Sequence, residues 1–173
     1  MIFENIKKLR RYLSENHNER PIYMTSGGFD PVHIGHVRCI QSTAKLAADG
    51  HRHPTLLNGL VVVVVNADSF LERKKGYAFM PLEERMEIID AIEGVDIVVP
   101  WEAAWPDQTV IGAIETLYPK YFTKGGDRFD ASTIPEWEIC QQIGCEIITG
   151  VGAGGKIQSS SDLVRRSNEF AKK

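Results

Sequence analysis

Two histidines stand three residues apart near the start of the chain, in a stretch that suits neither a helix nor a strand. Residues 25–36 read T-S-G-G-F-D-P-V-H-I-G-H, so that His33 and His36 follow two glycines and an Asp-Pro pair. Two imidazoles aimed at one point can bind a metal ion or donate hydrogen bonds to phosphate oxygens. A turn with two structural histidines is the alternative, and the spacing gives it equal weight. A zinc site has less support because no third ligand is evident.

The surroundings of the histidines favour phosphate as the ligand. Gly27 and Gly28 let the backbone approach a bulky ligand, since they carry no Cβ. The helix expected after Pro31 would direct free N–H groups and its positive dipole end at the same point. This stretch is therefore predicted to bind an anion.

A second cluster is basic. Residues 66–76 read N-A-D-S-F-L-E-R-K-K-G and follow a run of valines. Arg73, Lys74 and Lys75 form a compact group in which a lysine can neutralise phosphate as a point charge. The alternative is a solvated charged loop, but the position after a buried strand favours a functional group.

Two glycine-containing segments complete the set of candidate residues. K-G-G-D-R at 124–128 can turn backbone N–H groups toward a ligand, although Gly-Gly-Asp is also an ordinary turn. G-A-G-G-K-I-Q-S-S-S-D-L at 152–163 places a serine run at an expected helix start, where hydroxyls cap the helix and can also bind phosphate. The residues singled out are Lys124, Gly125, Gly126, Asp127, Ser159, Ser160 and Ser161.

The elements that must position these clusters alternate between strand and helix. Apolar, β-branched runs predict strands at 22–25, 60–65, 96–99, 121–123 and 146–149. Helices are expected at 35–48, 81–94, 107–117, 136–143 and 160–170. This order predicts one Rossmann-like, doubly wound α/β domain at 21–173, with a five-stranded parallel sheet and helices on both faces, preceded by an amphipathic helix within 1–20. Ligands bind such sheets at the carboxyl ends of the strands, where all four clusters fall.

Composition excludes several classes of function. The chain has 173 residues, 43% hydrophobic and 25% charged, with a formal net charge of −3. A nucleic-acid partner is not expected, because such proteins normally carry a basic excess. No apolar run is long enough to span a bilayer and no signal-peptide core is evident, so we expect a cytoplasmic protein without a membrane partner. Three cysteines without C-x-x-C spacing indicate idle thiols.

Taken together, these residues resemble the H-x-G-H nucleotidyltransferase superfamily, the cytidylyltransferase-like group. The resemblance covers nearly everything from Ile22 to Arg166. G-G-F-D-P-V-H-I-G-H after a first strand is highly specific, and the serine run stands where the I-S-S-T type signature is expected. K-G-G-D is most similar to adenylyltransferases that act on heptose phosphates. Glycerol-phosphate and phosphoethanolamine cytidylyltransferases share the architecture.

The resemblance implies a reaction and a role for each residue. A small phosphorylated acceptor, such as a sugar or polyol phosphate, would attack the α-phosphate of ATP or CTP and release pyrophosphate. Mg²⁺ would be carried by the triphosphate, with few or no ligands from the protein, and no metal-binding residue is singled out. His33 and His36 would form hydrogen bonds in the transition state, and Lys74 or Lys75, with no choice between them, would contact phosphate. Arg85 would lie near the acceptor, unless it is a surface helix arginine. The nucleotide would be bound by Gly27, Gly28, Phe29, Asp30, Lys124, Gly125, Gly126, Asp127, Ser159, Ser160 and Ser161.

Three departures from the family pattern leave the acceptor open. Heptose-type enzymes have Arg-Pro before the P-L-E-x-R helix, where Tyr77-Ala78 stands here. Glycerol-phosphate enzymes have an arginine before the serine signature, where only Lys156 is near. The polar insert at 49–58 is also longer than usual. Homodimers are common in this group, and the N-terminal helix could serve as the interface.

Two other functions compete with this one. H-I-G-H is also a signature of class I aminoacyl-tRNA synthetases, but the chain is short, lacks K-M-S-K-S and is acidic overall. A non-catalytic nucleotide sensor would keep the pocket and lose the chemistry. The presence of both histidines and the basic residues favours a working enzyme.

Overall fold

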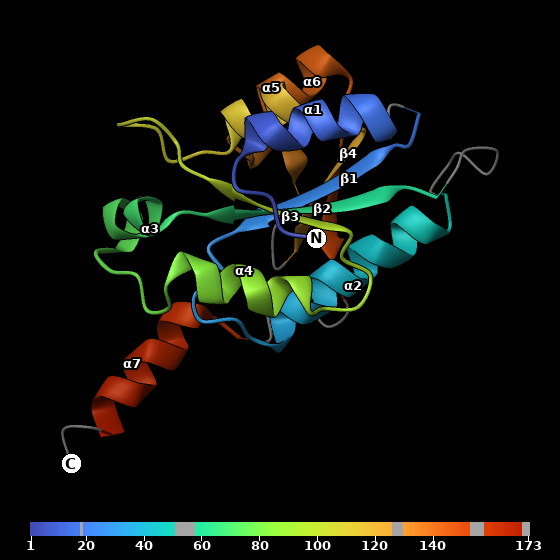
Figure 1. Ribbon diagram of the computed structural model, residues 1–173. Coiled ribbons are helices and arrows are strands. Elements are labelled where there is room, and N and C mark those ends of the chain that lie inside the picture. The colour runs from blue at the N-terminus through green and yellow to red at the C-terminus, as the bar shows by residue number, and fades with distance from the viewer. Residues whose placement is uncertain (18, 51–57, 126–129, 153–157, 171–173) are drawn as a thin grey trace.

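The computed structural model describes residues 1–17, 19–50, 58–125, 130–152 and 158–170 (Figure 1). Within them, no helix combines the length and apolar character that a membrane span requires.

A five-stranded parallel sheet forms the centre of the molecule. Its strands are β1 (Ile22–Gly27), β2 (Leu60–Asn66), β3 (Ile97–Trp101), β4 (Tyr121–Gly125) and β5 (Glu146–Val151). Their order in space is β3-β2-β1-β4-β5, which confirms the predicted doubly wound sheet. The chain builds outward from β1 to β3 and then returns to the other side of β1. The reversal therefore lies between β1 and β4, where such folds bind ligands.

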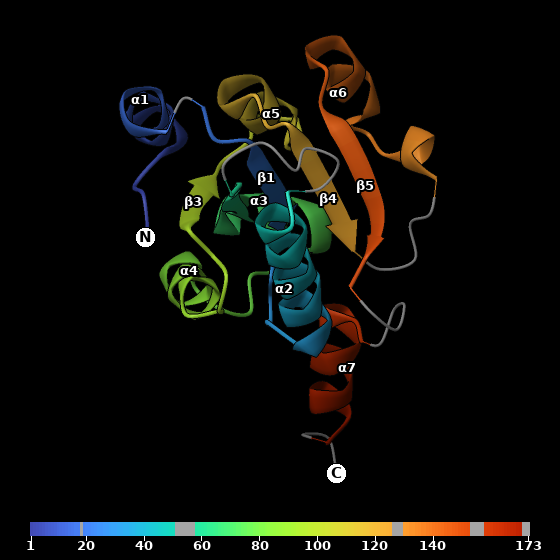
Figure 2. The ribbon, with the colours of Figure 1, turned by 90° about the vertical axis from the view of Figure 1, so that its right-hand side faces the viewer.

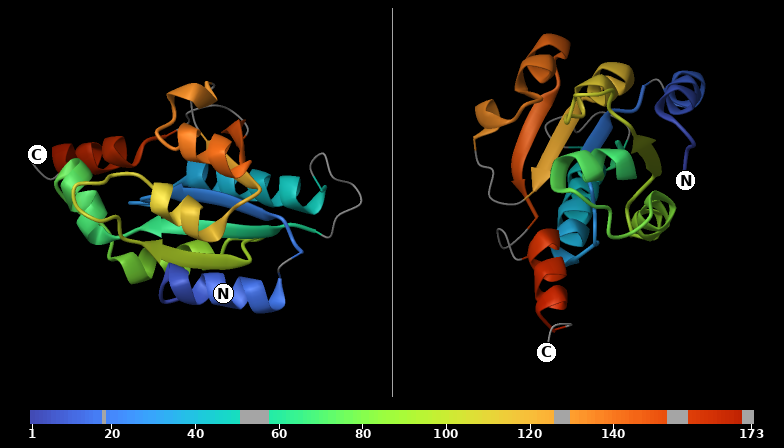
Figure 3. Two further views of the ribbon diagram at one scale, coloured as in Figure 1. Left: turned by 90° about the horizontal axis from the view of Figure 1, so that it is seen from above. Right: turned by 90° about the vertical axis from the view of Figure 1, so that its left-hand side faces the viewer.

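Helices cover both faces of the sheet, as Figures 1 and 2 show. One face carries α1 (Ile6–Asn16), α5 (Ile111–Leu117) and α6 (Trp137–Ile143), and the other carries α2 (Ile34–Ala48) and α4 (Leu82–Asp90). Two more helices, α3 (Asp68–Lys75) and α7 (Ser160–Phe170), lie beyond the carboxyl ends of the strands (Figure 3). A short 3-10 helix spans Ala131–Thr133.

The valine-rich strand β2 supplies the middle of both cores. Val62 and Val64 pack with α1 and α5, whereas Val61, Val63 and Val65 pack with α2 and α4. All five are at most 2% exposed. Burying one valine side chain contributes about 1.5 kcal/mol or more, so this strand fixes the sheet between its two helical layers.

Helix α1 belongs to the core. Asn5 caps it by accepting a hydrogen bond from the Lys8 N–H at 3.0 Å. Ile6, Leu9 and Leu13 are buried in the same cluster as α5. The amphipathic pattern of the first residues is thus explained by packing against the sheet.

Some element boundaries differ from the sequence-based expectation. The sequence indicated no helix at 68–75, yet α3 forms there, because Phe70 and Leu71 are buried and Gly76 ends the helix with φ 86°. A solvated loop is therefore the wrong description of the basic cluster. Helix α5 starts at Ile111 and not at 107, because the Asp107 carboxylate holds the Thr109 N–H in a local turn. Helix α4 ends at Asp90, before the expected residue 94.

Candidate active site

The two histidines form the N-terminal cap of α2. His33 is the N-cap residue, and its Nδ1 accepts the Gly35 N–H at 3.1 Å. His36 Nδ1 accepts the His33 N–H at 3.3 Å. The two rings are stacked, with centroids 3.7 Å apart. Since both Nδ1 atoms act as acceptors, the proton of each neutral ring lies on Nε2, which remains available as a donor.

Burial keeps both imidazoles neutral. It lowers the pKa of His33, and it lowers the pKa of His36 to about 3, with the neighbouring His33 ring contributing in the same direction. At neutral pH the pair therefore presents two uncharged N–H donors. Such donors can bind phosphate oxygens as negative charge builds on them, without a prior protonation step.

The turn before the histidines packs against side chains of α2 and α3. Phe29 has φ 51°, is 5% exposed, and meets the His36 ring edge-on at a centroid distance of 5.1 Å. A Cβ on Gly27 would lie 3.2 Å from the Phe29 ring, and one on Gly28 would lie 2.6 Å from Leu71 of α3. Both glycines thus make room for neighbouring side chains at the end of β1.

Asp30 is the most buried carboxylate of this region. Its side chain is 1% exposed. Oδ2 accepts from Lys75 Nζ at 2.7 Å and from the Phe79 N–H at 2.8 Å, and Oδ1 accepts from the Met80 N–H at 2.7 Å. Burial alone would raise the pKa of Asp30, but these hydrogen bonds outweigh it and hold the pKa below its usual value. The carboxylate is therefore charged at neutral pH.

The two candidate lysines have different surroundings. Lys75 also donates to the Asp30 carbonyl at 2.9 Å, and its ammonium lies 4.6 Å from the centre of the Tyr77 ring. Lys74 is exposed, and its ammonium lies 5.6 Å from the ring of Phe70. Only Lys75 is joined to the histidine turn.

Arg85 is fully buried, so a surface helix arginine is the wrong description. Its Nη1 donates to the carbonyls of Gly28 at 2.6 Å and Asn66 at 2.8 Å. Its Nε donates to the Met80 carbonyl at 2.9 Å, and Nη2 pairs with Asp68 at 2.5 Å. The guanidinium ties the ends of β1 and β2 to the starts of α3 and α4.

At the end of β4, Lys124 lies beside β1. Its ammonium is 3.4 Å from Ser26 Oγ, 3.7 Å from the Glu136 carboxylate and 4.4 Å from the Phe122 ring centre. Gly125 fits against Cys39 of α2, whose sulfur would lie 2.8 Å from an added Cβ. These contacts bring the β4 segment to the same edge as the histidines. Gly126, Asp127 and Lys156, and most of the insert at 49–58, lie outside the described residues.

The serine run is joined to the histidine turn. Ser160 starts α7, and its hydroxyl donates to the Pro31 carbonyl at 2.9 Å. The carbonyl of Ser159 accepts the Leu163 N–H at 3.1 Å in the first turn of the helix. Ser161 lines a hollow of about 440 Å³ between α7 and the segment that precedes α4.

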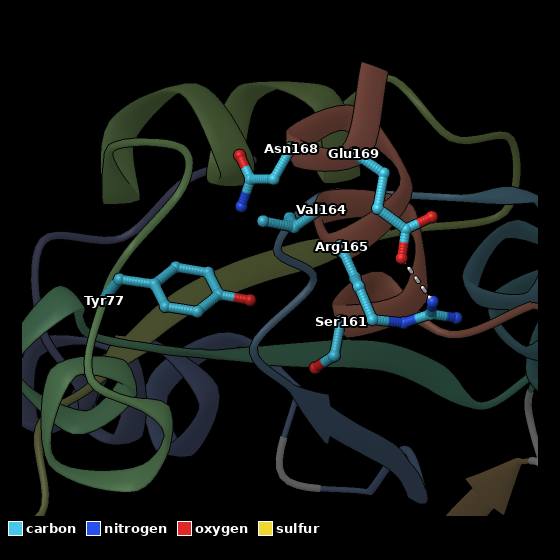
Figure 4. A pocket seen from close by; sticks show the side chains of 6 residues that line it. All are labelled: Tyr77, Ser161, Val164, Arg165, Asn168 and Glu169. Carbon is cyan, nitrogen blue, oxygen red and sulfur yellow. Dashed lines mark hydrogen bonds and ion pairs between the residues drawn. The ribbon is translucent and has the colours of Figure 1, made fainter. Parts of the chain in front are cut away.

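This hollow contains residues that sequence reasoning missed. Figure 4 shows the Tyr77 ring on one side of it and α7 on the other, with Arg165 paired to Glu169 at 2.8 Å. The side chains that line it are Tyr77, Ser161, Val164, Arg165, Asn168 and Glu169. Positions 161, 165 and 168 repeat at helical spacing from the serine run, a signal that could have identified this face of α7.

Among the described residues, no group of three or more histidine, cysteine, aspartate or glutamate side chains could hold a metal ion. A magnesium ion that arrives on a triphosphate needs no such group, because Mg²⁺ commonly keeps several waters and binds substrate phosphates.

Comparison with known proteins supports the resemblance. Residues 24–148 match the model of the family described as cytidylyltransferase-like. The chain is 34% identical to the bifunctional protein HldE of Hahella chejuensis over 133 residues, 76% of this chain and 24% of that protein. It is 37% identical to the bifunctional protein HldE of Yersinia pestis over 149 residues, 85% of this chain and 26% of that protein. The chain thus spans about a quarter of the length of these relatives.

Solved structures confirm the fold. A lipopolysaccharide core biosynthesis protein from Thermoplasma volcanium superposes with a TM-score of 0.58 at 19% identity, covering 78% of this chain and 98% of that one. A pantoate-beta-alanine ligase from Francisella tularensis superposes with a TM-score of 0.62 at 12% identity, covering 100% of this chain and 78% of that one. At these identities the likeness concerns the fold alone.

Proposed function

Because the chain belongs to the cytidylyltransferase-like family, we propose that it joins a nucleoside triphosphate to a small phosphorylated acceptor. An acceptor phosphate oxygen attacks the α-phosphorus, the bond from that phosphorus to the β-phosphate oxygen breaks, and pyrophosphate leaves. Sugar and polyol phosphates are the acceptor class that the motifs favour. K-G-G-D at 124–127 favours ATP over CTP as the nucleotide.

One observation carries the proposal: two neutral, stacked imidazoles stand at the start of α2 with both Nε2–H groups available. They lie at the carboxyl edge of the sheet, next to its point of reversal. Hydrogen bonds from fixed donors to the oxygens of a phosphate that gains charge in the transition state lower the barrier by about 3 kcal/mol each, a hundredfold or more in rate. No covalent intermediate is needed, because positioning and charge stabilisation suffice for phosphoryl transfer.

The remaining residues then take supporting roles. Lys75 contacts acceptor phosphate, because Asp30 holds its ammonium beside the histidine turn, and Lys74 is left outside the site. Ser159, Ser160 and Ser161 at the start of α7 meet the β- and γ-phosphates, where free N–H groups favour an anion. Arg85 acts by position, since its guanidinium is engaged by backbone carbonyls and Asp68.

The test is pyrophosphate release with ATP and with CTP against a panel of sugar and polyol phosphates. We expect release that depends on both the nucleotide and one acceptor class. Tight nucleotide binding without release across the panel would favour a non-catalytic sensor. His17→Ala is a suitable control variant, because His17 follows α1 and contacts Tyr12.

A further inference from the structure

Asp30 and Pro31, which lie three and two residues before His33, hold both walls of the hollow in Figure 4. Asp30 accepts the N–H groups of Phe79 and Met80, in the segment that carries Tyr77. The Pro31 carbonyl accepts the hydroxyl of Ser160, at the start of α7. These three hydrogen bonds join residues that are 49, 50 and 129 positions apart in the sequence. One dipeptide therefore fixes two distant segments against the histidines.

Asp30 also holds Lys75 in a defined orientation. An ammonium group has three hydrogens. One is directed at the Asp30 carboxylate at 2.7 Å and one at the Asp30 carbonyl at 2.9 Å. The third remains for a ligand, and the ammonium is also held over the Tyr77 ring. The Lys75 side chain is 20% exposed, so this third hydrogen is within reach of an incoming phosphate.

We propose that Asp30 is a positioning residue for the acceptor side of the site, acting through Lys75 and the segment at 77–80. This inference rests on the proposed function. It departs from the expectation that Asp30 touches the nucleotide, because each carboxylate oxygen already accepts from the chain's own donors. Its effect belongs to acceptor binding and not to nucleotide binding.

The chemistry of the carboxylate makes the role specific. Both carboxylate oxygens of Asp30 accept hydrogen bonds from N–H donors, so this position needs a side chain with two acceptor atoms. Asparagine has nearly the same shape, but its amide would turn an N–H₂ group toward one of those donors. Asp30→Asn therefore breaks the arrangement with almost no change of volume.

The experiment measures pyrophosphate release by Asp30→Asn, Lys75→Met and the double variant, with acceptor and nucleotide varied separately. We expect each single variant to raise the acceptor KM by about tenfold or more, the usual effect of losing a hydrogen bond to a charged group. The nucleotide KM should change by less than about twofold, and the double variant should resemble the worse single variant, since coupled residues are not additive.

Two further variants sharpen the test. Lys45→Met removes an exposed lysine near the end of α2 and should leave both KM values unchanged. Lys74→Met should raise the acceptor KM far less than Lys75→Met. An unchanged acceptor KM in Asp30→Asn, or effects that multiply in the double variant, would overturn the proposal. If Asp30→Asn does not fold, Lys75→Met and Lys74→Met still decide which lysine serves the acceptor.

A wrong proposed function would give a different result from a wrong role of Asp30. In that case the wild type releases no pyrophosphate with any acceptor, and trypsin then tests the arrangement itself. Cleavage after Lys74 and Lys75 should be faster in Asp30→Asn than in the wild type, because the segment is no longer held. Equal cleavage rates would overturn the positioning role as well.

Discussion

Replacing His36 with alanine distinguishes a catalytic role of this residue from a structural one. The variant loses an Nε2–H donor, whose removal from a transition state costs about 3 kcal/mol. It also loses the acceptor for the His33 N–H, worth about 1 kcal/mol as a helix cap, and the edge contact with Phe29, worth about 0.5–1.5 kcal/mol. The expected loss of stability is therefore about 2 kcal/mol, well within what a domain of this size tolerates.

These magnitudes predict a large loss of turnover with a small loss of stability. The kcat should fall about a hundredfold or more, with little change in KM, because the donor acts mainly in the transition state. The melting temperature should fall by about 4–8 °C. Pyrophosphate release per folded molecule and thermal unfolding are measured on the same preparation. Unchanged activity per folded molecule, together with a large stability loss, would refute the catalytic role and support a structural turn.

Three more predictions follow from the same geometry. Burial lowers the pKa of His36 to about 3, from 6.5 in the unfolded chain, so the contribution of the neutral imidazole to the free energy of unfolding is complete above pH 6.5 and is lost as pH falls toward 3. His36→Ala should reduce the slope of the unfolding free energy against pH, measured by urea unfolding, by at most about 1.4 kcal/mol per pH unit. The same slope in the wild type and the variant would contradict the lowered pKa. Arg85→Ala leaves the carbonyls of Gly28, Asn66 and Met80 without their donor and should lower the unfolding free energy by about 4 kcal/mol, whereas a loss under about 1 kcal/mol would show that water replaces it. Gly28→Ala places a Cβ 2.6 Å from Leu71 and should cost about 1–3 kcal/mol; Leu71→Ala should relieve part of that cost, and strictly additive effects would rule out the clash.

The periodic parts of the molecule could be predicted from the sequence. The five strands and the helix after the histidines follow from apolar runs, glycines and prolines, which act locally. The carboxyl-edge position of the clusters followed from the parallel order alone. The sequence alone therefore places His33 and His36 near the start of a helix.

The features that the sequence did not predict depend on contacts between residues that are far apart in the chain. Helix α3 has eight residues, too few for a clear period, and is held by burial of Phe70 and Leu71. Nothing near Arg85 in the sequence indicates that its guanidinium reaches the Gly28 carbonyl, 57 residues away. The choice between Lys74 and Lys75 likewise depends on Asp30, 45 residues before Lys75. Such contacts are decided by the fold and leave no local pattern.

Nitrogen NMR of the labelled imidazoles tests the central claim most directly. In the free protein at pH 7, His33 and His36 should both be neutral, with the proton on Nε2 and Nδ1 acting as an acceptor. Addition of nucleoside triphosphate with Mg²⁺ should shift the Nε2 resonances of both rings and leave His17 unchanged. Rings that carry their proton on Nδ1, or that do not respond to saturating nucleotide, would contradict the account.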